Sequence, residues 1–374
     1  MNPSDTGPTI SPRREKLFAA LSLILGTAMA LMFAEWGLDI YFQRIQCQTM
    51  DPGLIRYHSQ LGWALSPGWT GQHTHHDYHS IYNIGPDGFR IQSEGTVDGD
   101  ARQYAVLGDS FTFGFGVEDE QTFVSQLNAM GVNTFRNYGI PGTSTDQQLL
   151  LLRQIIPDDS SVGVMLVVYL ANDLLDNTLP YPLQAEQAKP FFRLENGRLE
   201  LSNSPVPLVP KPALLRSTTL SSVVLEGFTI QDSAFAGTSL GRLVTTIASD
   251  RQYDEDELRP VLERNLTPAL ELFAVLLDDI AQEIAQSGSG LTVVLLPGRD
   301  AMVNPNGVSH HYQEYLRQSV MALLERRSID NVDLMAVMAT ESEADIRLMY
   351  YPNDGHLTPE GHRYVAAKLA QTFN

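Results

Sequence analysis

Two short segments, far apart in the sequence, carry the residue types that acyl transfer through a serine requires. Gly108-Asp109-Ser110 follows directly on an apolar run, and Asp354 and His356 stand shortly before the last predicted helix. A serine attacks an ester carbonyl when a neutral imidazole takes its proton and a carboxylate orients that imidazole. Because a Gly-Asp-Ser turn is as typical of a helix cap as of a nucleophile, the two segments indicate chemistry only as a set.

Two further segments could donate hydrogen bonds to the oxyanion that such a reaction forms. Residues 137–142, Asn-Tyr-Gly-Ile-Pro-Gly, form a glycine turn that could aim a backbone N–H into a site, and Asn172 offers a side-chain amide. Each follows an apolar run of its own. Because the carboxyl ends of parallel strands lie along one edge of a sheet, we expect these groups to meet in one crevice.

From about residue 104 the chain alternates short apolar runs with longer amphipathic segments, which is typical of a parallel sheet covered by helices on both faces. The strands predicted by this pattern are 104–107, 134–138, 162–170, 291–296 and 332–337. The predicted helices are 121–130, 144–156, 256–286 and 312–326, followed by a last helix with Thr358 as N-cap and Pro359 at its first position. The sequence therefore predicts an α/β domain over residues 103–374.

An insertion of about residues 174–254 separates the third predicted strand from the first long helix. It is rich in proline, and within its segment 191–201 Asn196-Gly197 stands between alternating apolar residues. That dipeptide in that setting predicts a β-hairpin. Long surface insertions often shape binding sites, so this one is a candidate for shaping the substrate site.

The N-terminal part predicts a membrane anchor. Residues 17–33 carry no charge and follow a basic cluster formed by Arg13, Arg14 and Lys16. This length predicts a transmembrane helix over residues 17–42, with residues 1–16 in the cytoplasm and everything after the helix in the periplasm or another extracytoplasmic space. Ala28-Met29-Ala30 is similar to a signal-peptidase site, so a cleaved signal is one alternative and a buried helix of a soluble protein is another.

Residues 43–102 predict a small β-rich lead-in module, because turn sequences separate short strands that bear aromatic residues. We expect the module to pack beside the main domain. It contains a histidine-rich stretch, for which a structural zinc site and a solvated loop are the two interpretations: His73, His75, His76, Asp77 and His79. The single cysteine of the chain, Cys47, has no partner for an intramolecular disulfide, and we expect it to be a small buried or membrane-proximal residue.

The composition excludes one class of partner and permits a large core. A formal net charge of −19 would repel the phosphates of nucleic acid, so no nucleic-acid partner is expected. A hydrophobic share of 43% is ample for a folded interior. Serine acyl transfer needs neither a metal nor a cofactor, and we expect none in the catalytic site.

The ordered set of segments resembles the SGNH/GDSL hydrolases over the predicted α/β domain apart from its insertion. That resemblance implies a flavodoxin-like three-layer α/β/α fold with a central parallel sheet. It implies Ser110 as the nucleophile and His356 as the base. It also implies an oxyanion hole made by the N–H of Ser110, the N–H of Gly139 and the side-chain amide of Asn172. Gly142 is the alternative to Gly139.

The chain departs from the family pattern at two positions. The family places the triad aspartate three residues before the histidine, where this chain has Asn353, and the carboxylate here is Asp354. Either Asp354 orients His356 from the shifted position, or a backbone carbonyl does so and leaves a Ser-His dyad. The family also has a glycine two residues before Asn172, where this chain has Leu170.

The resemblance and the predicted export together imply an extracytoplasmic esterase that removes O-acyl groups from a carbohydrate or polysaccharide through a serine acyl-enzyme. The O-acetyl group is the first candidate for the acyl group. The lead-in also resembles that of membrane-tethered family members near polysaccharide pathways, which makes pathway proteins candidate partners. An O-acyltransferase with the same acyl-enzyme is the alternative. A catalytically silent polysaccharide-binding or assembly factor is another. A lipase or thioesterase would use apolar residues of the insertion as an acyl groove: Phe191, Phe192, Leu208 and Leu214.

Overall fold

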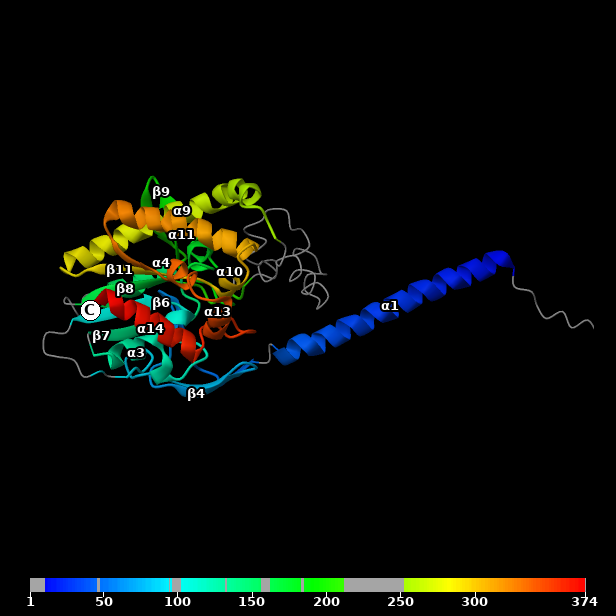
Figure 1. Cartoon of the computed structure of the whole chain (residues 1–374), viewed down its shortest axis with the longest axis horizontal. Coiled ribbons are helices and arrows are strands. Elements are labelled where there is room, and N and C mark those ends of the chain that lie inside the picture. Colours follow the sequence, from blue (N-terminus) through cyan, green and yellow to red (C-terminus); the bar gives the residue numbers. More distant parts are fainter. Residues whose placement is uncertain are drawn as a thin grey trace, which may run out of the picture.

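A five-stranded parallel sheet lies at the centre of the computed structural model, which describes residues 11–45, 48–93, 95, 102–131, 133–155, 162–182, 185–211 and 252–373. The sheet (Figure 1) consists of β6 (Gln103–Gly108), β7 (Thr134–Gly139), β8 (Val162–Tyr169), β11 (Leu291–Leu296) and β12 (Asp330–Asp333). Its strand order is β12-β11-β8-β6-β7, and every neighbouring pair is parallel. Counted along the chain from β6, this is the order of flavodoxin-like folds, as predicted.

Helices cover both faces of the sheet (Figure 1). One face carries α3 (Phe123–Ala129) and α14 (Pro359–Phe373), which contact each other, and the other carries α4 (Thr145–Ile155), α9 (Glu255–Gln286) and α11 (Val308–Arg327). The short helices are α2 (Ser110–Phe113), η1 (Asp119–Gln121), α5 (Asp173–Asp176), α10 (Arg299–Val303), α12 (Leu334–Met338) and α13 (Glu343–Met349). The three-layer α/β/α prediction is therefore confirmed.

The core forms because the central strands are apolar on both sides and the long helices are apolar on one. Every residue of β11 is buried, as a strand with helices on both faces requires. Along α9 the fully buried residues Leu266, Phe273, Leu277 and Ile280 recur at helical spacing. The helix boundaries predicted for this half of the chain agree with α9 and α11 to within a few residues.

The prediction of a strand over residues 332–337 is wrong for most of that range. β12 ends at Asp333, and the apolar residues that follow form α12. The reason is a helix cap, because the Asp333 side chain accepts a hydrogen bond from Ala336 N–H at 3.0 Å. The last helix does begin as predicted, since Thr358 Oγ1 accepts from Gly361 N–H at 3.1 Å.

The lead-in module is β-rich, as predicted. β1 (Gln48–Met50), β4 (Thr70–His75) and β5 (His79–Asn83) form one antiparallel sheet, and β2 (Ile55–His58) pairs with β3 (Gly62–Leu65) in a hairpin. The hairpin is attached to the main domain, because Trp63 Nε1 donates to Pro141 O at 2.9 Å. The module therefore packs against the segment that follows β7.

A buried arginine provides a second attachment between the lead-in and the main domain. The Arg90 side chain is 0% exposed, and its Nε lies 2.7 Å from Asp119 Oδ1. Its remaining nitrogens donate to the backbone carbonyls of Phe113, Gly114 and Val117, directly after helix α2. Because this guanidinium has its donors bound, it fixes the end of α2 relative to the lead-in.

The insertion contains the predicted hairpin, β9 (Phe191–Glu195) with β10 (Arg198–Ser202). Asn196 and Gly197 both have positive φ, 51° and 75°, which a two-residue hairpin turn of this type requires. The part of the insertion from 212 to 251, with Leu214, lies outside the described residues, and so does Cys47.

Two close contacts join the insertion to its surroundings. Lys189 is fully buried and donates to the buried carboxylate of Asp146 at the start of α4. Next to it, Gly62 of the lead-in has φ +84°, and a Cβ there would lie 2.7 Å from Ala188 O. The lead-in and the insertion therefore touch through their backbones.

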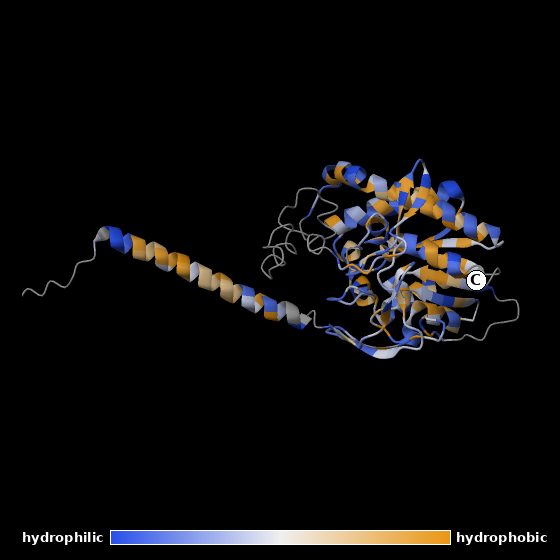
Figure 2. Ribbon diagram, turned by 180° about the vertical axis from the view of Figure 1, so that it is seen from behind, coloured by the Kyte–Doolittle hydropathy of each residue, from blue (hydrophilic) through white to orange (hydrophobic). Residues whose placement is uncertain are grey.

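Helix α1 (Pro12–Ile45) is long and apolar enough over Arg13–Tyr41 to cross a membrane. None of its most apolar stretch is buried, and Figure 2 shows the helix, with many residues coloured as hydrophobic, apart from the α/β domain. The interpretation as a packed helix of a soluble core therefore finds no support in the contacts. The helix agrees in length and composition with the predicted anchor.

One buried histidine makes the stability of this fold depend on pH. His362 in α14 is 1% exposed, and its Nδ1 accepts from Phe123 N–H at 3.1 Å. Burial first, and then the charges of Arg90 and His356, lower the pKa of His362 from 6.5 to about 3. Between these two values the unfolded chain binds a proton that the folded chain does not, so stability is lost as the pH falls through this window.

We expect His362→Asn to weaken this pH dependence, because the Asn carbonyl can accept from Phe123 but cannot take a proton. Below about pH 6.5, the free energy of unfolding of the wild type should fall more steeply than that of the variant, by up to about 1.4 kcal/mol per pH unit. Urea unfolding of the full chain in detergent measures both slopes, with the exposed His76→Asn as control. Equal slopes for His362→Asn and the wild type would contradict a neutral buried imidazole.

Candidate active site

The turn from β6 into α2 presents Ser110 at the carboxyl edge of the sheet. Asp109 caps the helix, because its Oδ1 accepts from Phe111 N–H at 2.9 Å. Gly108 is required in this turn, since a Cβ there would lie 2.1 Å from Thr112 Oγ1. Asp109 thus caps the short helix that carries Ser110.

The loop between α13 and α14 brings a histidine and a carboxylate to this serine. His356 Nε2 lies 2.8 Å from Ser110 Oγ, and His356 Nδ1 lies 2.5 Å from Asp354 Oδ1. Gly355, with φ +86°, forms the turn between the two residues. Of the two alternatives for the partner of Nδ1, the structure therefore contains the carboxylate.

The electrostatics of the hydrogen-bonded series Asp354–His356–Ser110 favour an ionised aspartate beside the imidazole. Burial raises the pKa of Asp354, but hydrogen bonds from His356, the charge of His356 and a hydrogen bond from Tyr78 outweigh it, so the pKa is lowered to about 2. An ionised Asp354 can only accept, which places the proton of the imidazole on Nδ1 and leaves Nε2 to accept from Ser110. The imidazole can then take the serine proton.

Two phenylalanines flank the imidazole. The rings of Phe111 and Phe115 lie 4.7 Å and 5.1 Å from the His356 ring, measured between centroids. Phe115 also lines the cleft at Ser110. These apolar neighbours lower the local polarity around the imidazole and so strengthen its hydrogen bonds to the serine and the carboxylate.

The structure contradicts the choice of Gly139 as an oxyanion donor. Its N–H donates to Asn137 Oδ1 at 2.9 Å, and a Cβ at this position would lie 2.2 Å from Phe113 N. Gly139 is therefore packed against helix α2. Gly142, the alternative, has φ +77° and lines the cleft beside Ser110. Among the hydrogen bonds of the described residues, the N–H groups of Gly142 and Ser110 have no acceptor.

Asn172 follows β8 at the same edge of the sheet. Its Nδ2 donates to Asp176 Oδ2 at 2.9 Å, and the residue is 6% exposed. An amide nitrogen carries two hydrogens, so one remains for an oxyanion. Leu170, which replaces the family glycine, is fully buried, and its N–H donates to Leu296 O at 2.9 Å.

A cleft of about 550 Å³ opens at Ser110 and His356. Ile55 and Trp63 of the β2–β3 hairpin line one side of this cleft, and residues 185–187 of the insertion line another. The insertion therefore contributes to the cleft as the sequence predicts, whereas the sequence does not indicate the contribution of the hairpin. The cleft is thus formed jointly by the α/β domain, the lead-in and the insertion.

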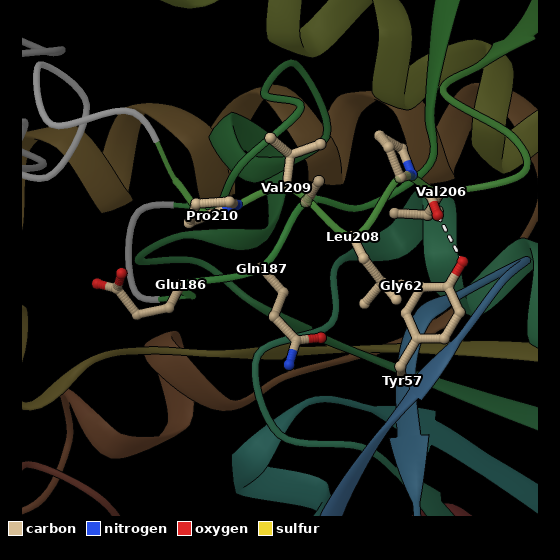
Figure 3. Close-up of a pocket in the computed structure, with 10 residues that line it drawn as sticks. Tyr57, Gly62, Glu186, Gln187, Val206, Leu208, Val209 and Pro210 are labelled. Carbon is tan, nitrogen blue, oxygen red and sulfur yellow. Dashed lines mark hydrogen bonds between the residues drawn. The ribbon is translucent and has the colours of Figure 1, made fainter.

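A second pocket of about 290 Å³ adjoins this cleft (Figure 3). It shares Glu186 and Gln187 with the cleft and extends to Tyr57 and Leu208. Tyr57 faces Trp63 across the β2–β3 hairpin, and its OH donates to Val206 O at 2.5 Å. Cleft and pocket therefore meet at Glu186 and Gln187 beside this hairpin, and we call the two together the substrate groove.

The histidine-rich stretch is not a solvated loop. It forms β4 and the turn into β5, in which His73 and His75 are buried and His76 and His79 are exposed. His73 Nδ1 lies 2.7 Å from Tyr82 OH. Among the described residues, no set of three histidine, cysteine, aspartate or glutamate side chains is placed to hold a metal ion.

At the carboxyl edge of a flavodoxin-like sheet, Ser110 is hydrogen-bonded to an imidazole that is hydrogen-bonded to a carboxylate. This arrangement is typical of hydrolase-type sites for acyl transfer. Residues 254–374 match the family model described as the SGNH hydrolase-like domain of the acetyltransferase AlgX. The matched range contains Asp354 and His356 and begins after Ser110. It confirms the resemblance to SGNH hydrolases over the C-terminal part of the chain.

No curated protein matches the sequence. Similar solved structures include a lipolytic G-D-S-L protein from Veillonella parvula, with 14% identity and a TM-score of 0.36; the match covers 73% of this chain and 98% of that one. A putative lipolytic G-D-S-L protein from Desulfitobacterium hafniense has 11% identity and a TM-score of 0.40, and the match covers 72% of this chain and 98% of that one. Another is the acetyl xylan esterase AlAXEase (11%, 0.39, 72% and 98%). At TM-scores below 0.5 these likenesses carry no argument about activity.

We expect Ser110→Ala to abolish covalent labelling by a fluorophosphonate, because the reagent needs an activated serine. Asp354→Asn should slow labelling by roughly 10³ to 10⁴, since the amide no longer holds the imidazole in the required tautomer. Intact-mass spectrometry over time measures both rates. Asp279→Asn, which removes a carboxylate that pairs with Arg153 on the surface, is the matched control. If Asp354→Asn is labelled at the wild-type rate, the catalytic group is a Ser-His dyad without a catalytic aspartate.

Proposed function

We propose that this protein is a membrane-anchored, extracytoplasmic serine esterase that removes O-acyl groups, O-acetyl groups first, from a carbohydrate. The observation that carries the proposal is the series Asp354–His356–Ser110 at the mouth of the substrate groove. In this mechanism Ser110 Oγ attacks the ester carbonyl while His356 Nε2 takes its proton. The imidazolium then protonates the leaving sugar oxygen as the bond between the acyl carbon and this oxygen breaks. Water, deprotonated by His356, attacks the acyl-enzyme in the same way, and Ser110 Oγ leaves with the proton returned by the imidazolium.

The groups around Ser110 could stabilise the charge that develops on the carbonyl oxygen. The N–H groups of Ser110 and Gly142 and the second amide hydrogen of Asn172 are the proposed donors. In related chemistry each such donor contributes roughly 10² to 10³ in rate. The ionised Asp354 stabilises the imidazolium at the same stage of the reaction.

The size of the substrate groove supports an ester of a bulky alcohol. An acetyl group has three heavy atoms, whereas the cleft at Ser110 alone measures about 550 Å³ and continues toward Tyr57. Binding sites of several hundred Å³ are typical of ligands with many more atoms. The remaining space suits the alcohol part of the substrate, and a sugar or short oligosaccharide has the required size.

A second candidate function is O-acetyl transfer. The description of the matched family model names an acetyltransferase, AlgX, and this favours acetyl transfer. The acyl-enzyme on Ser110 would be the same, but a sugar hydroxyl in place of water would attack it with His356 as base. The complete series of three side chains disfavours a catalytically silent binding factor.

We expect the full-length protein to release acetate from acetylated oligosaccharides, with a kcat/KM that rises with oligosaccharide length because longer alcohols fill the groove. Acetate release is measured by proton NMR, with Ser110→Ala as control. Incubation with p-nitrophenyl acetate and an unacetylated oligosaccharide tests transfer, since mass spectrometry detects the acetylated product. Acetyl transfer to the oligosaccharide without net release of acetate would show that the protein is an acetyltransferase and not an esterase. If the protein reacts with fluorophosphonate but forms neither acetate nor acetylated oligosaccharide, carbohydrate esters are excluded as its substrates.

We propose that α1 anchors the protein with its N-terminus in the cytoplasm, because Arg13, Arg14 and Lys16 precede the apolar run. We expect full-length protein to stay in the membrane pellet after extraction at alkaline pH. Immunoblotting of pellet and supernatant measures this. Full-length protein in the supernatant would overturn the anchor, and a shortened product there would indicate cleavage near Ala28-Met29-Ala30.

A further inference from the structure

The carboxylate of the series sits two residues before His356, and the structure shows what holds it there. Asn353, at the position where the family has its aspartate, points to the lead-in module. Its N–H donates to Asp77 Oδ2 at 2.8 Å and its side-chain Nδ2 donates to Asp77 Oδ1 at 2.6 Å. Asp354 N–H donates to the same Asp77 Oδ2 at 3.0 Å. One carboxylate thus binds two consecutive residues of the loop between α13 and α14, which we call the catalytic loop.

The neighbour of this aspartate reaches the series directly. Tyr78 OH donates to Asp354 Oδ2 at 3.1 Å, while Oδ1 of the same carboxylate accepts from His356. The two oxygens of Asp354 therefore have different partners, one from the lead-in and one from the catalytic loop. Burial and the charge of Asp354 raise the pKa of Tyr78, so its hydroxyl stays a donor.

Asp77 and Tyr78 belong to the tight turn between β4 and β5. His75 N–H donates to Tyr78 O at 2.9 Å, which closes the turn. The Asp77 side chain is 4% exposed, and among the described residues its only ion-pair contact is with His75 Nδ1, 3.9 Å away. A carboxylate this buried depends on its hydrogen-bond donors, and these donors are the catalytic loop.

We propose that Asp77 and Tyr78 are positioning residues for the catalytic series, acting through Asp354. Asp77 holds Asn353 away from His356 and thereby turns Asp354 inward. Tyr78 fixes the second oxygen of that carboxylate. The lead-in module is then part of the active site, although it contributes no group that touches the reacting atoms. This inference rests on the proposed serine chemistry but not on the identity of the substrate.

The expected effects follow from the number of hydrogen bonds that each residue makes. Asp77→Ala frees three donors and lets the loop shift, so kcat for p-nitrophenyl acetate should fall by roughly 10- to 100-fold. Tyr78→Phe removes one oxygen and should lower kcat by roughly 2- to 10-fold. In both variants KM should stay within about twofold of wild type, because neither residue touches the groove.

The decisive measurement is a double-mutant cycle with Asp354→Ala on the full-length protein in detergent, read by kcat and by the fluorophosphonate labelling rate. If Asp77 and Tyr78 act through Asp354, their substitutions have no further effect in the Asp354→Ala background. Tyr351→Phe is the matched control, since it removes a neighbouring hydroxyl that donates to Gly116 O. That carbonyl keeps a second donor in Ser80 Oγ.

Wild-type kcat in both Asp77→Ala and Tyr78→Phe would overturn the inference. An equal loss with and without the Asp354 side chain would also overturn it, because it would show a general structural effect. Failure of the wild type to label at all would instead contradict the proposed serine chemistry. The two failures are therefore separate. Tyr78→Phe keeps the test open if Asp77→Ala does not fold.

Discussion

One buried guanidinium holds together the two parts of the molecule on which the site depends. Arg90 comes from the lead-in, yet it binds the Asp119 carboxylate and the carbonyls that follow the nucleophile helix. Separating these parts would leave a buried charge and several carbonyls without partners, which is costly away from water. The placement of Ser110 thus depends on residues outside the parallel sheet. The catalytic unit is larger than the α/β domain alone.

The central strands of the sheet could be predicted because they are buried on both faces and are therefore largely apolar along their length. β11 is the clearest example, since a short apolar run with Thr292, Val293 and Val294 between Gly290 and Pro297 favours a buried strand. The run after Val332 is equally apolar but becomes a helix, because Asp333 caps it. Apolar character alone does not distinguish a short strand from a short helix, so a side-chain cap decided the outcome.

The site was predictable where residues stand at the ends of elements, as Ser110 and His356 do. The sequence offers Asp354 as the partner of His356 but does not decide between this carboxylate and a backbone carbonyl, because Asp77, which binds Asn353 and Asp354, belongs to a distant part of the chain. Gly139, the last residue of β7, and Gly142, three residues later, gave a similar ambiguity. Which of them faces the crevice depends on how closely α2 packs, and neighbouring residues in the sequence carry no sign of that distance.

The close approach of Gly62 to Ala188 has a consequence for how such proteins diversify. A side chain at this position has no room, and the adjacent Lys189 already occupies a fully buried place against Asp146. The lead-in and the insertion must therefore change together, although all the elements from β4 to α5 separate them in the sequence. Substrate preference in chains of this architecture would be inherited as a pair of co-varying segments, and a groove taken from a relative would need both.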